Sequence, residues 1–175
     1  MNKFAELIRS RRSTRKFTEE LLSPEQVETI LKAGLMSPTS KNSCPWHFVV
    51  VEDKFLLEKM SVSKKSGSKL IAGCALAIVV LSDPQISEAW VEDASIASIM
   101  IQLQAEDLGL GSCWVQIKDR YTADENSSEE YIKDLLNIPL HLQVLSIVAI
   151  GHKAQELSPF SDENLQWEKV HIGKY

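Results

Sequence analysis

The chain of 175 residues has the length of one domain, and its 44% hydrophobic and 25% charged residues are ordinary for a globular protein. This composition excludes a disordered tail, a collagen-like repeat and a coiled coil, and no apolar run approaches the ~18 residues of a membrane span. The formal net charge of -5 argues against a general nucleic-acid-binding role.

The first half of the chain predicts helices that alternate with short strands. Apolar residues at helical spacing indicate a short helix over residues 2–9. Ser23, followed by Pro24 and Gln26, has the N-cap, first-turn proline and capping box of a second helix, which we expect to stop before Pro38. A short strand over residues 48–51 and a helix beginning near Leu56 come next, and we expect an exposed loop over 61–69.

The second half contains the strongest apolar patterns. Residues 75–81 form a continuous β-type apolar run, as expected of a central strand. Residues 87–108 give the longest helical pattern, and between Ala94 and Ala105 it carries no charge. A helix that is apolar nearly all round must be buried on several sides, so we expect a central helix completed within the chain or by a second subunit.

The remaining elements are short. We expect strands over 112–117 and 144–150 and a helix over 128–136. The last 25 residues have little periodicity, so they are stable only if they lie on another surface, within the chain or on a partner. The prediction is one α+β domain over residues 1–175, with a small mixed or antiparallel sheet flanked by helices.

A cationic cluster opens the chain. Residues 1–16 carry six lysines and arginines against the single acid Glu6, although the whole protein is acidic. In extended backbone Arg11, Ser13 and Arg15 would share one face and form a clamp for a small anion such as phosphate. The alternative, which the residues alone leave open, is a solvated basic stretch or an RNA contact.

A loop bounded by two prolines, residues 37–48, precedes the first strand. It is rich in hydroxyl and amide groups, and Asn42 can both donate to and accept from a heterocycle. By itself this segment is more often a structural turn whose polar side chains satisfy backbone groups.

Two glycine-containing segments follow the long helix and the last strand. Gly109 suits a left-handed helix end, and Gly111 suits a close backbone approach. The pattern is neither a dinucleotide fingerprint nor a phosphate loop. After Gly151, Lys153 could add a charge to a phosphate site, although an ordinary exposed strand end is the simpler interpretation.

The sequence shows no side-chain catalytic machinery. It has no nucleophile elbow, and its four histidines lack metal-ligand spacing. The cysteines, Cys44, Cys74 and Cys113, form neither a zinc pair nor a disulfide framework, which fits a reducing compartment. Because the N-terminus also lacks the apolar core of a signal peptide, we expect a cytoplasmic protein in which any difficult chemistry is done by a cofactor.

Taken in order, these segments resemble the nitroreductase family of FMN-dependent oxidoreductases over nearly the whole chain. Four pieces carry the resemblance: residues 11–17, residues 37–48, the long helix from Glu92-Asp93-Ala94 into 109–114, and residues 150–153 with 168–171 in the tail. The resemblance implies an α+β homodimer with the long helix at its interface and two FMN sites between the subunits. It also implies that NAD(P)H, as NADH or NADPH, supplies electrons by a ping-pong mechanism to an acceptor such as a nitroaromatic or a quinone.

The resemblance assigns cofactor contacts but neither a catalytic side chain nor a metal. Four residues would hold the FMN phosphate and ribityl chain, namely Arg11, Arg12, Ser13 and Arg15. Four would approach the isoalloxazine ring from the other subunit, namely Pro38, Thr39, Ser40 and Asn42. The opposite part of the flavin would meet Trp114, Gln116 and Ile117, and the phosphate end would meet Gly151, His152 and Lys153.

The chain departs from the family pattern at several points. Cys44 stands where many members have glutamine, the tail lacks a late arginine that many members place on the phosphate, and the contacts of residues 61–69 do not align. The chain is also short for the family, which implies a small substrate cap and a permissive pocket. A flavoprotein with another reaction, such as a dehydrogenase or a dehalogenase, and a non-enzymatic flavin-binding dimer remain alternatives.

Overall fold

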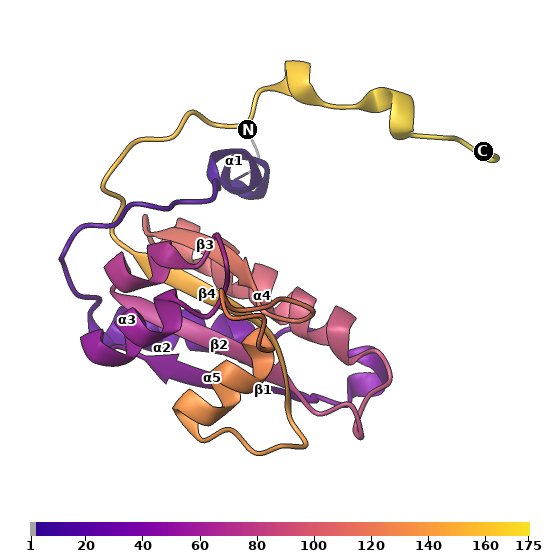
Figure 1. Ribbon diagram of the computed structural model, residues 1–175. Coiled ribbons are helices and arrows are strands. Elements are labelled where there is room, and N and C mark those ends of the chain that lie inside the picture. Colours follow the sequence, from indigo (N-terminus) through magenta and orange to yellow (C-terminus); the bar gives the residue numbers. More distant parts are fainter. Residues whose placement is uncertain (1–2) are drawn as a thin grey trace.

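The computed structural model describes residues 3–175 and is built on one antiparallel sheet (Figure 1). The strand order is β1-β2-β4-β3, and every neighbouring pair is antiparallel. The strands are β1 Trp46–Val51, β2 Leu76–Ser82, β3 Gly111–Gln116 and β4 Gln143–Gly151. The α+β class is confirmed, and of the two expected sheet types the structure shows the antiparallel one.

Helices cover both faces of the sheet (Figure 1). The helices α2 and α4 pack on one face, and α3 and α5 pack on the other. Their bounds are α1 Lys3–Ser10, α2 Pro24–Leu35, α3 Lys54–Ser61, α4 Trp90–Asp107 and α5 Ser128–Leu136. Four short 3₁₀ segments lie in the connections and the tail: η1 Ser40–Asn42, η2 Lys69–Gly73, η3 Asp162–Asn164 and η4 Trp167–Lys169.

Local sequence signals explain where these helices begin. Ser23 Oγ accepts the amide of Gln26 at 3.2 Å, and the Gln26 side chain accepts the amide of Ser23 at 2.8 Å, so the predicted capping box of α2 is confirmed. Asp53 caps α3 through the amide of Leu56. The predicted α1 is also confirmed for its described part, whereas its first expected position, residue 2, lies outside the described residues.

The predicted central strand is confirmed. All seven residues of β2 are buried, because the strand lies between β1 and β4 and has helices on both faces. Its alternate side chains enter two separate cores: Ile78 and Val80 face α2 and α4, whereas Ala77 and Val79 face α3 and α5. This two-sided burial explains why the sequence of β2 is apolar without alternation.

The long helix is only partly covered. Ala94, Ala97 and Ile101 are wholly buried against the sheet and α2, whereas Ile96 and Ile99 remain 36% and 39% exposed. The described helix begins at Trp90, three residues after the predicted start. One chain therefore does not bury the whole apolar circumference of α4.

The predicted exposed loop at 61–69 is wrong for part of its length. Ser63 and Ser68 are wholly buried. The hydroxyl of Ser68 donates to the carbonyl of Ser61, and the hydroxyl of Ser128 donates to the carbonyl of Ser63 at 2.6 Å. Serine-to-backbone hydrogen bonds let this polar segment enter the interior, and composition alone does not reveal them.

The C-terminal residues form an arm that leaves the body of the molecule (Figure 1). Its base is held by the Arg9–Asp162 ion pair and by a hydrogen bond from Arg12 to the carbonyl of Ser158 at 2.8 Å. Every residue from 158 to 175 is nevertheless exposed, including Trp167. Over residues 3–175, no helix combines the length and apolar character that crossing a membrane requires.

Candidate functional site

Residues 11–17 form an extended segment along the free edge of β3 and past the end of β4. Ser13 bridges to Ser112 in parallel, and Phe17 bridges to Lys153 in antiparallel. The amide of Thr14 donates to the carbonyl of Ser112 at 2.9 Å. These contacts with β3 and β4 fix the segment on the sheet. A solvated basic stretch, the alternative interpretation, would make no such contacts.

Two glycines allow this close approach. A Cβ on Gly111 would lie 2.6 Å from Cγ2 of Thr14, and a Cβ on Gly151 would lie 3.0 Å from Cδ1 of the Phe17 ring. Real Cβ atoms do not tolerate the first of these distances. The close approach predicted at Gly111 is confirmed, and the approaching group is the side chain of Thr14. Gly109 has the predicted left-handed backbone, with φ of 76°.

Cationic side chains lie near Cys113 of β3, beside this segment. Burial raises the pKa of the Cys113 thiol, and the nearby charges of Arg15, Arg11 and Lys64 and a hydrogen bond with Ser13 oppose that shift. Four side chains from two separate segments, residues 11–15 and Lys64, thus act on one buried thiol. Arg11, Ser13 and Arg15, the alternate residues of the predicted clamp, thus all act on the same thiol of β3.

Lys64 is a member of this cluster that the sequence analysis missed. Burial lowers the pKa of its ammonium group, and repulsion from Arg120 lowers it further. The available signal was the Lys64-Lys65 pair in the segment 61–69, but its position near residues 11–15 depends on packing between distant segments. Within residues 3–175, four cations form no ion pair with a carboxylate, namely Lys64, Arg120, Arg11 and Arg15.

This donor set suits a phosphate group. Guanidinium groups present paired donors that match phosphate oxygens, and a serine hydroxyl adds a short neutral donor. Four cations without carboxylate partners repel one another, and a bound dianion would relieve that repulsion. Because these donors are cationic, they favour an anion over a metal ion.

Three further residues predicted at the phosphate end have other partners. Arg12 donates to the carbonyl of Ser158 and so holds the base of the arm. The Lys153 ammonium pairs with Glu106 at 2.8 Å, which compensates its charge. His152 Nε2 lies 3.6 Å from a Glu20 carboxylate oxygen and has no hydrogen bond within the described chain. In a single chain the clamp thus consists of Arg11, Ser13 and Arg15 with Lys64.

The proline-bounded loop lies at the opposite corner of the sheet. β1 begins at Trp46, which pairs with Ser82 at one end of the sheet, whereas Gly111 pairs with Gly151 at the other end. β1 and β3 are also the two outer strands. Three strand spacings and one strand length separate the two corners, which amounts to roughly 20 Å or more. One chain therefore does not bring residues 38–42 to its own cationic cluster.

The loop has an unusual backbone. Three of its residues that are not glycine have left-handed φ values, 53° at Lys41, 54° at Asn42 and 47° at Cys44. The amide of Cys44 donates to Thr39 Oγ1 at 3.0 Å, and the amide of Asn42 donates to the carbonyl of Thr39. Asn42 and Pro38 are exposed, and Thr39 and Ser40 are half-buried, so all four predicted residues remain accessible to a second molecule.

The third predicted group, on β3, is divided by the pleat of the strand. Trp114 Nε1 donates to Gln116 Oε1 at 3.0 Å, and both side chains are half-buried. Ile117 is wholly buried in the core under α3 and α5, its amide donates to Leu145, and its carbonyl accepts the amide of Arg120. Ile117 therefore packs in the core and is not available to a ligand.

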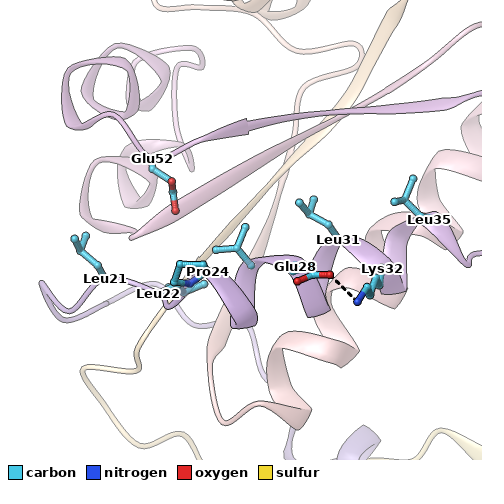
Figure 2. A pocket seen from close by; sticks show the side chains of 9 residues that line it. Leu21, Leu22, Pro24, Glu28, Leu31, Lys32, Leu35 and Glu52 are labelled. Atoms are coloured by element: carbon cyan, nitrogen blue, oxygen red, sulfur yellow. Dashed lines mark ion pairs between the residues drawn. The ribbon is translucent and has the colours of Figure 1, made fainter.

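A groove whose lining includes none of the cationic-cluster residues lies elsewhere on the described surface (Figure 2). Its volume is about 780 Å³, and it runs between α2 and the end of β1. The Lys32 ammonium in this groove is already paired with Glu28 at 2.7 Å, so it offers no free cation to a phosphate. Most of the lining is apolar, formed by Leu21, Leu22, Pro24, Val27, Leu31 and Leu35.

Comparisons of the sequence with a family model and with a known protein both identify nitroreductases. The sequence model described as "Nitroreductase family" matches residues 8–63 and 57–152. A protein of Archaeoglobus fulgidus, provisionally named NADH dehydrogenase/NAD(P)H nitroreductase, is 34% identical over the full length of both chains.

Solved structures share the fold. The structure of an FMN-dependent nitroreductase from Clostridium difficile R20291 has a TM-score of 0.94 and 38% identity, covering 97% of this chain and 98% of that one. A structure from Desulfovibrio desulfuricans, provisionally named a nitroreductase and solved in complex with FMN, has a TM-score of 0.79 and 25% identity, covering 100% of this chain and 99% of that one.

Proposed function

This chain belongs to the nitroreductase family, and from this premise we propose that it is a homodimeric FMN-dependent oxidoreductase. It uses NADH or NADPH to reduce an electron acceptor such as a nitroaromatic or a quinone. The two substrates bind in turn, so that the oxidised nicotinamide leaves before the acceptor enters.

The observation that carries the proposal is the cationic cluster on β3. The charges of Arg11, Arg15 and Lys64 act on the same thiol as Ser13, and these cations lack carboxylate partners within residues 3–175, in a protein with a net charge of -5. The group that balances such a cluster is a phosphate monoester, which FMN carries. Arg11, Ser13, Arg15 and Lys64 would therefore hold the phosphate end of the cofactor.

When bound, FMN supplies the redox chemistry, since its ring system takes a hydride from reduced nicotinamide and passes electrons to the acceptor. The chain's own residues bind and orient it. The hydrogen bond between Trp114 and Gln116 fixes both side chains on the outer strand next to the clamp. Gly151, the last residue of β4, pairs with Gly111, the first residue of β3. The two strands therefore end in register on the side of the proposed phosphate site.

The ring end of the site needs a second copy of the chain. Residues 38–42 of the same chain lie at the far corner of the sheet, so the polar groups of this loop would reach a cofactor held by another subunit. The exposed side of α4, with Ile96 and Ile99, supports a helix-to-helix contact between the two copies. Such a contact would bury the apolar surface that one chain leaves open.

The C-terminal arm supports the same assembly. It carries exposed apolar side chains on a segment that leaves its own body, namely Leu165, Trp167, Val170 and Ile172. β1 is an edge strand, and the apolar groove of Figure 2 lies beside it. We propose that the arm of one subunit lies in this groove of the other, which would cover both surfaces at once.

Replacement of Trp167 by alanine is expected to weaken the dimer about 30-fold, because a central aromatic anchor is typically worth about 2 kcal/mol or more. Sedimentation velocity over a concentration series measures the change. The matched control is Leu140→Ala, which removes another exposed apolar side chain far from the arm. An unchanged dissociation constant for the Trp167 variant would show that the arm does not hold the dimer together.

The proposed function is tested on the purified protein under anaerobic conditions. We expect a yellow protein whose visible absorbance bleaches on addition of NADH or NADPH and returns on addition of a quinone or a nitroaromatic. Initial rates at several acceptor concentrations should give parallel double-reciprocal lines, as alternating binding requires.

Other outcomes identify the alternatives. A yellow protein that keeps its absorbance under excess NADH and NADPH would favour a flavoprotein with another reaction or a flavin-binding module. A colourless protein that takes up no added FMN would contradict the proposal as a whole.

A further inference from the structure

A buried carboxylate lies beneath the proline-bounded loop. Asp93, in the first turn of α4, is only 2% exposed. Its Oδ1 accepts the amide of Ser40 at 2.7 Å, and its Oδ2 accepts the hydroxyl of Ser87 at 2.7 Å. No lysine, arginine or histidine of the described chain pairs with it. Burial of a charged carboxylate costs free energy unless the group is hydrogen-bonded. The two oxygens of Asp93 bind segments outside its own helix, which indicates that the side chain has a role beyond α4.

Capping of α4 does not provide this explanation. The helix has no side-chain cap at its N-terminus, and the amide of Asp93 already donates to the carbonyl of Ala89. The two carboxylate oxygens instead bind Ser40 in the loop and Ser87 in the segment before the helix. The side chain thus links α4 to two other segments.

The loop depends on this link for its position. Between residues 38 and 44 the other hydrogen bonds stay inside the loop, from Cys44 to Thr39, from Asn42 to Thr39 and from Ser43 to Ser40. The bond from Ser40 to Asp93 is the one that ties this segment to the body of the protein. A left-handed backbone is strained for residues other than glycine. Three such residues in one short loop persist only where contacts with the rest of the protein stabilise them.

We propose that Asp93 is a positioning residue for the ring end of the cofactor site. It holds the amide of Ser40 and so orients residues 38–42 toward the cofactor bound by the other subunit. The inference rests on the proposed function. Asp93 does not touch the cofactor itself. It acts by positioning the loop that completes the cofactor site of the other subunit.

The first test compares Asp93→Ala with Asp93→Asn. The alanine variant loses both acceptors, so the loop is released, whereas asparagine keeps one oxygen for Ser40 and offers an amide donor to the Ser87 hydroxyl. We expect the alanine variant to retain FMN through its intact cationic cluster but to show an altered visible flavin spectrum and at least a 10-fold lower kcat. The asparagine variant should recover most of both. Equal spectra and equal kcat for the wild type and the alanine variant would overturn the proposal.

The second test asks whether Asp93 acts across the dimer. In a mixed dimer of Asp93→Ala and Arg15→Ala chains, one of the two sites combines an intact cationic cluster with an intact loop, and the other site has neither. We expect mixing by co-expression with two affinity tags to restore up to half of the wild-type activity. If loop and cluster acted within one chain, both sites of the mixed dimer would be defective, and the absence of any gain would refute the proposal.

A third pair of variants applies if loss of the buried carboxylate unfolds the protein. Ser40→Pro removes the donor amide while Asp93 stays in place, and the extended backbone of Thr39, with φ of -135° and ψ of 160°, accepts a following proline. Ser40→Ala removes the same hydroxyl but keeps the amide, so it is the reference. A lower kcat and a changed flavin spectrum in the proline variant relative to the alanine variant support the proposal, and identical values overturn it. Failure of the wild-type protein to bind FMN would instead contradict the proposed function.

Discussion

Replacement of Gly111 by alanine is expected to destabilise the protein and to empty the cofactor site together. The new Cβ would lie 2.6 Å from Cγ2 and 2.7 Å from both Cβ and Oγ1 of Thr14. Thr14 is 1% exposed, and its amide is bound to the carbonyl of Ser112, so it cannot move aside without leaving the strand. Overpacking of this kind typically costs about 1–3 kcal/mol.

The effect on the cofactor follows from the geometry of the segment. Thr14 lies between the clamp residues Ser13 and Arg15, so a displacement of Thr14 moves both of them. Thermal denaturation should show a melting temperature lower by about 2–4 °C for each kcal/mol lost. Titration with FMN should show weaker binding by the same protein.

Gly73→Ala is the matched control for this substitution. A Cβ at Gly73 would meet nothing within 4 Å, and its φ does not lie in the left-handed region. Since alanine also restricts the unfolded chain, we expect a change of no more than about 1 kcal/mol, in the stabilising direction. Equal stabilities of the Gly111 and Gly73 variants would contradict the close packing between Thr14 and β3.

Replacement of Arg15 by alanine is expected to weaken FMN binding without a comparable loss of stability. A charge-assisted hydrogen bond is worth about 1.5–3 kcal/mol, which corresponds to a roughly 10- to 100-fold higher dissociation constant. Arg15 is exposed, and its hydrogen bond within the chain, to the carbonyl of Ser13, is long at 3.4 Å. The side chain therefore contributes little to the fold, and the purified variant should be pale and depleted of FMN.

Lys16→Ala separates this local effect from a change in net charge. Lys16 is the adjacent cation and is exposed, but it is not among the charges that act on Cys113. Titration of each apoprotein with FMN, followed by flavin fluorescence, should give a near wild-type dissociation constant for this control. Equal affinities of the Arg15 variant and the wild type would remove Arg15 from the proposed phosphate site.

The two substitutions give different patterns of loss. Gly111→Ala should lower the melting temperature and FMN affinity together, because it disturbs the backbone that carries the clamp. Arg15→Ala should lower the affinity alone, because it removes a ligand contact from an intact backbone. Measuring both quantities on both variants therefore distinguishes the support of the site from its contacts.

Local patterns predicted the elements of the fold well. The capping box at Ser23 is present, α5 covers the expected residues 128–136, and the apolar run at 75–81 is the buried strand β2. These signals act over a few residues, through caps, side-chain periodicity and burial on both faces, so they are readable without knowledge of distant segments. The alternation of Arg11, Ser13 and Arg15 is equally local, and all three residues act on the Cys113 thiol.

Contacts between distant segments could not be predicted from the sequence. The family resemblance implies a flavin contact for Ile117, but the side chain is buried in the core under α3 and α5. The cation of Lys153 is paired with Glu106, and Lys64 joins the clamp from a loop that was expected to be exposed. Each of these contacts joins residues at least 40 positions apart or depends on how the helices pack on the sheet. Neither kind of contact leaves a periodic pattern in the sequence.

The sequence by itself determined the class of the fold, the family, and the apolar central strand and helix, because short-range preferences and residue chemistry are written in local order. Only the tertiary structure decided that Thr14 packs against Gly111, that Asp93 holds Ser40, and that the loop and the clamp occupy opposite corners of one sheet. The physical reason is that such contacts depend on the order and register of the strands and on which helices cover each face. These are settled when the whole chain packs.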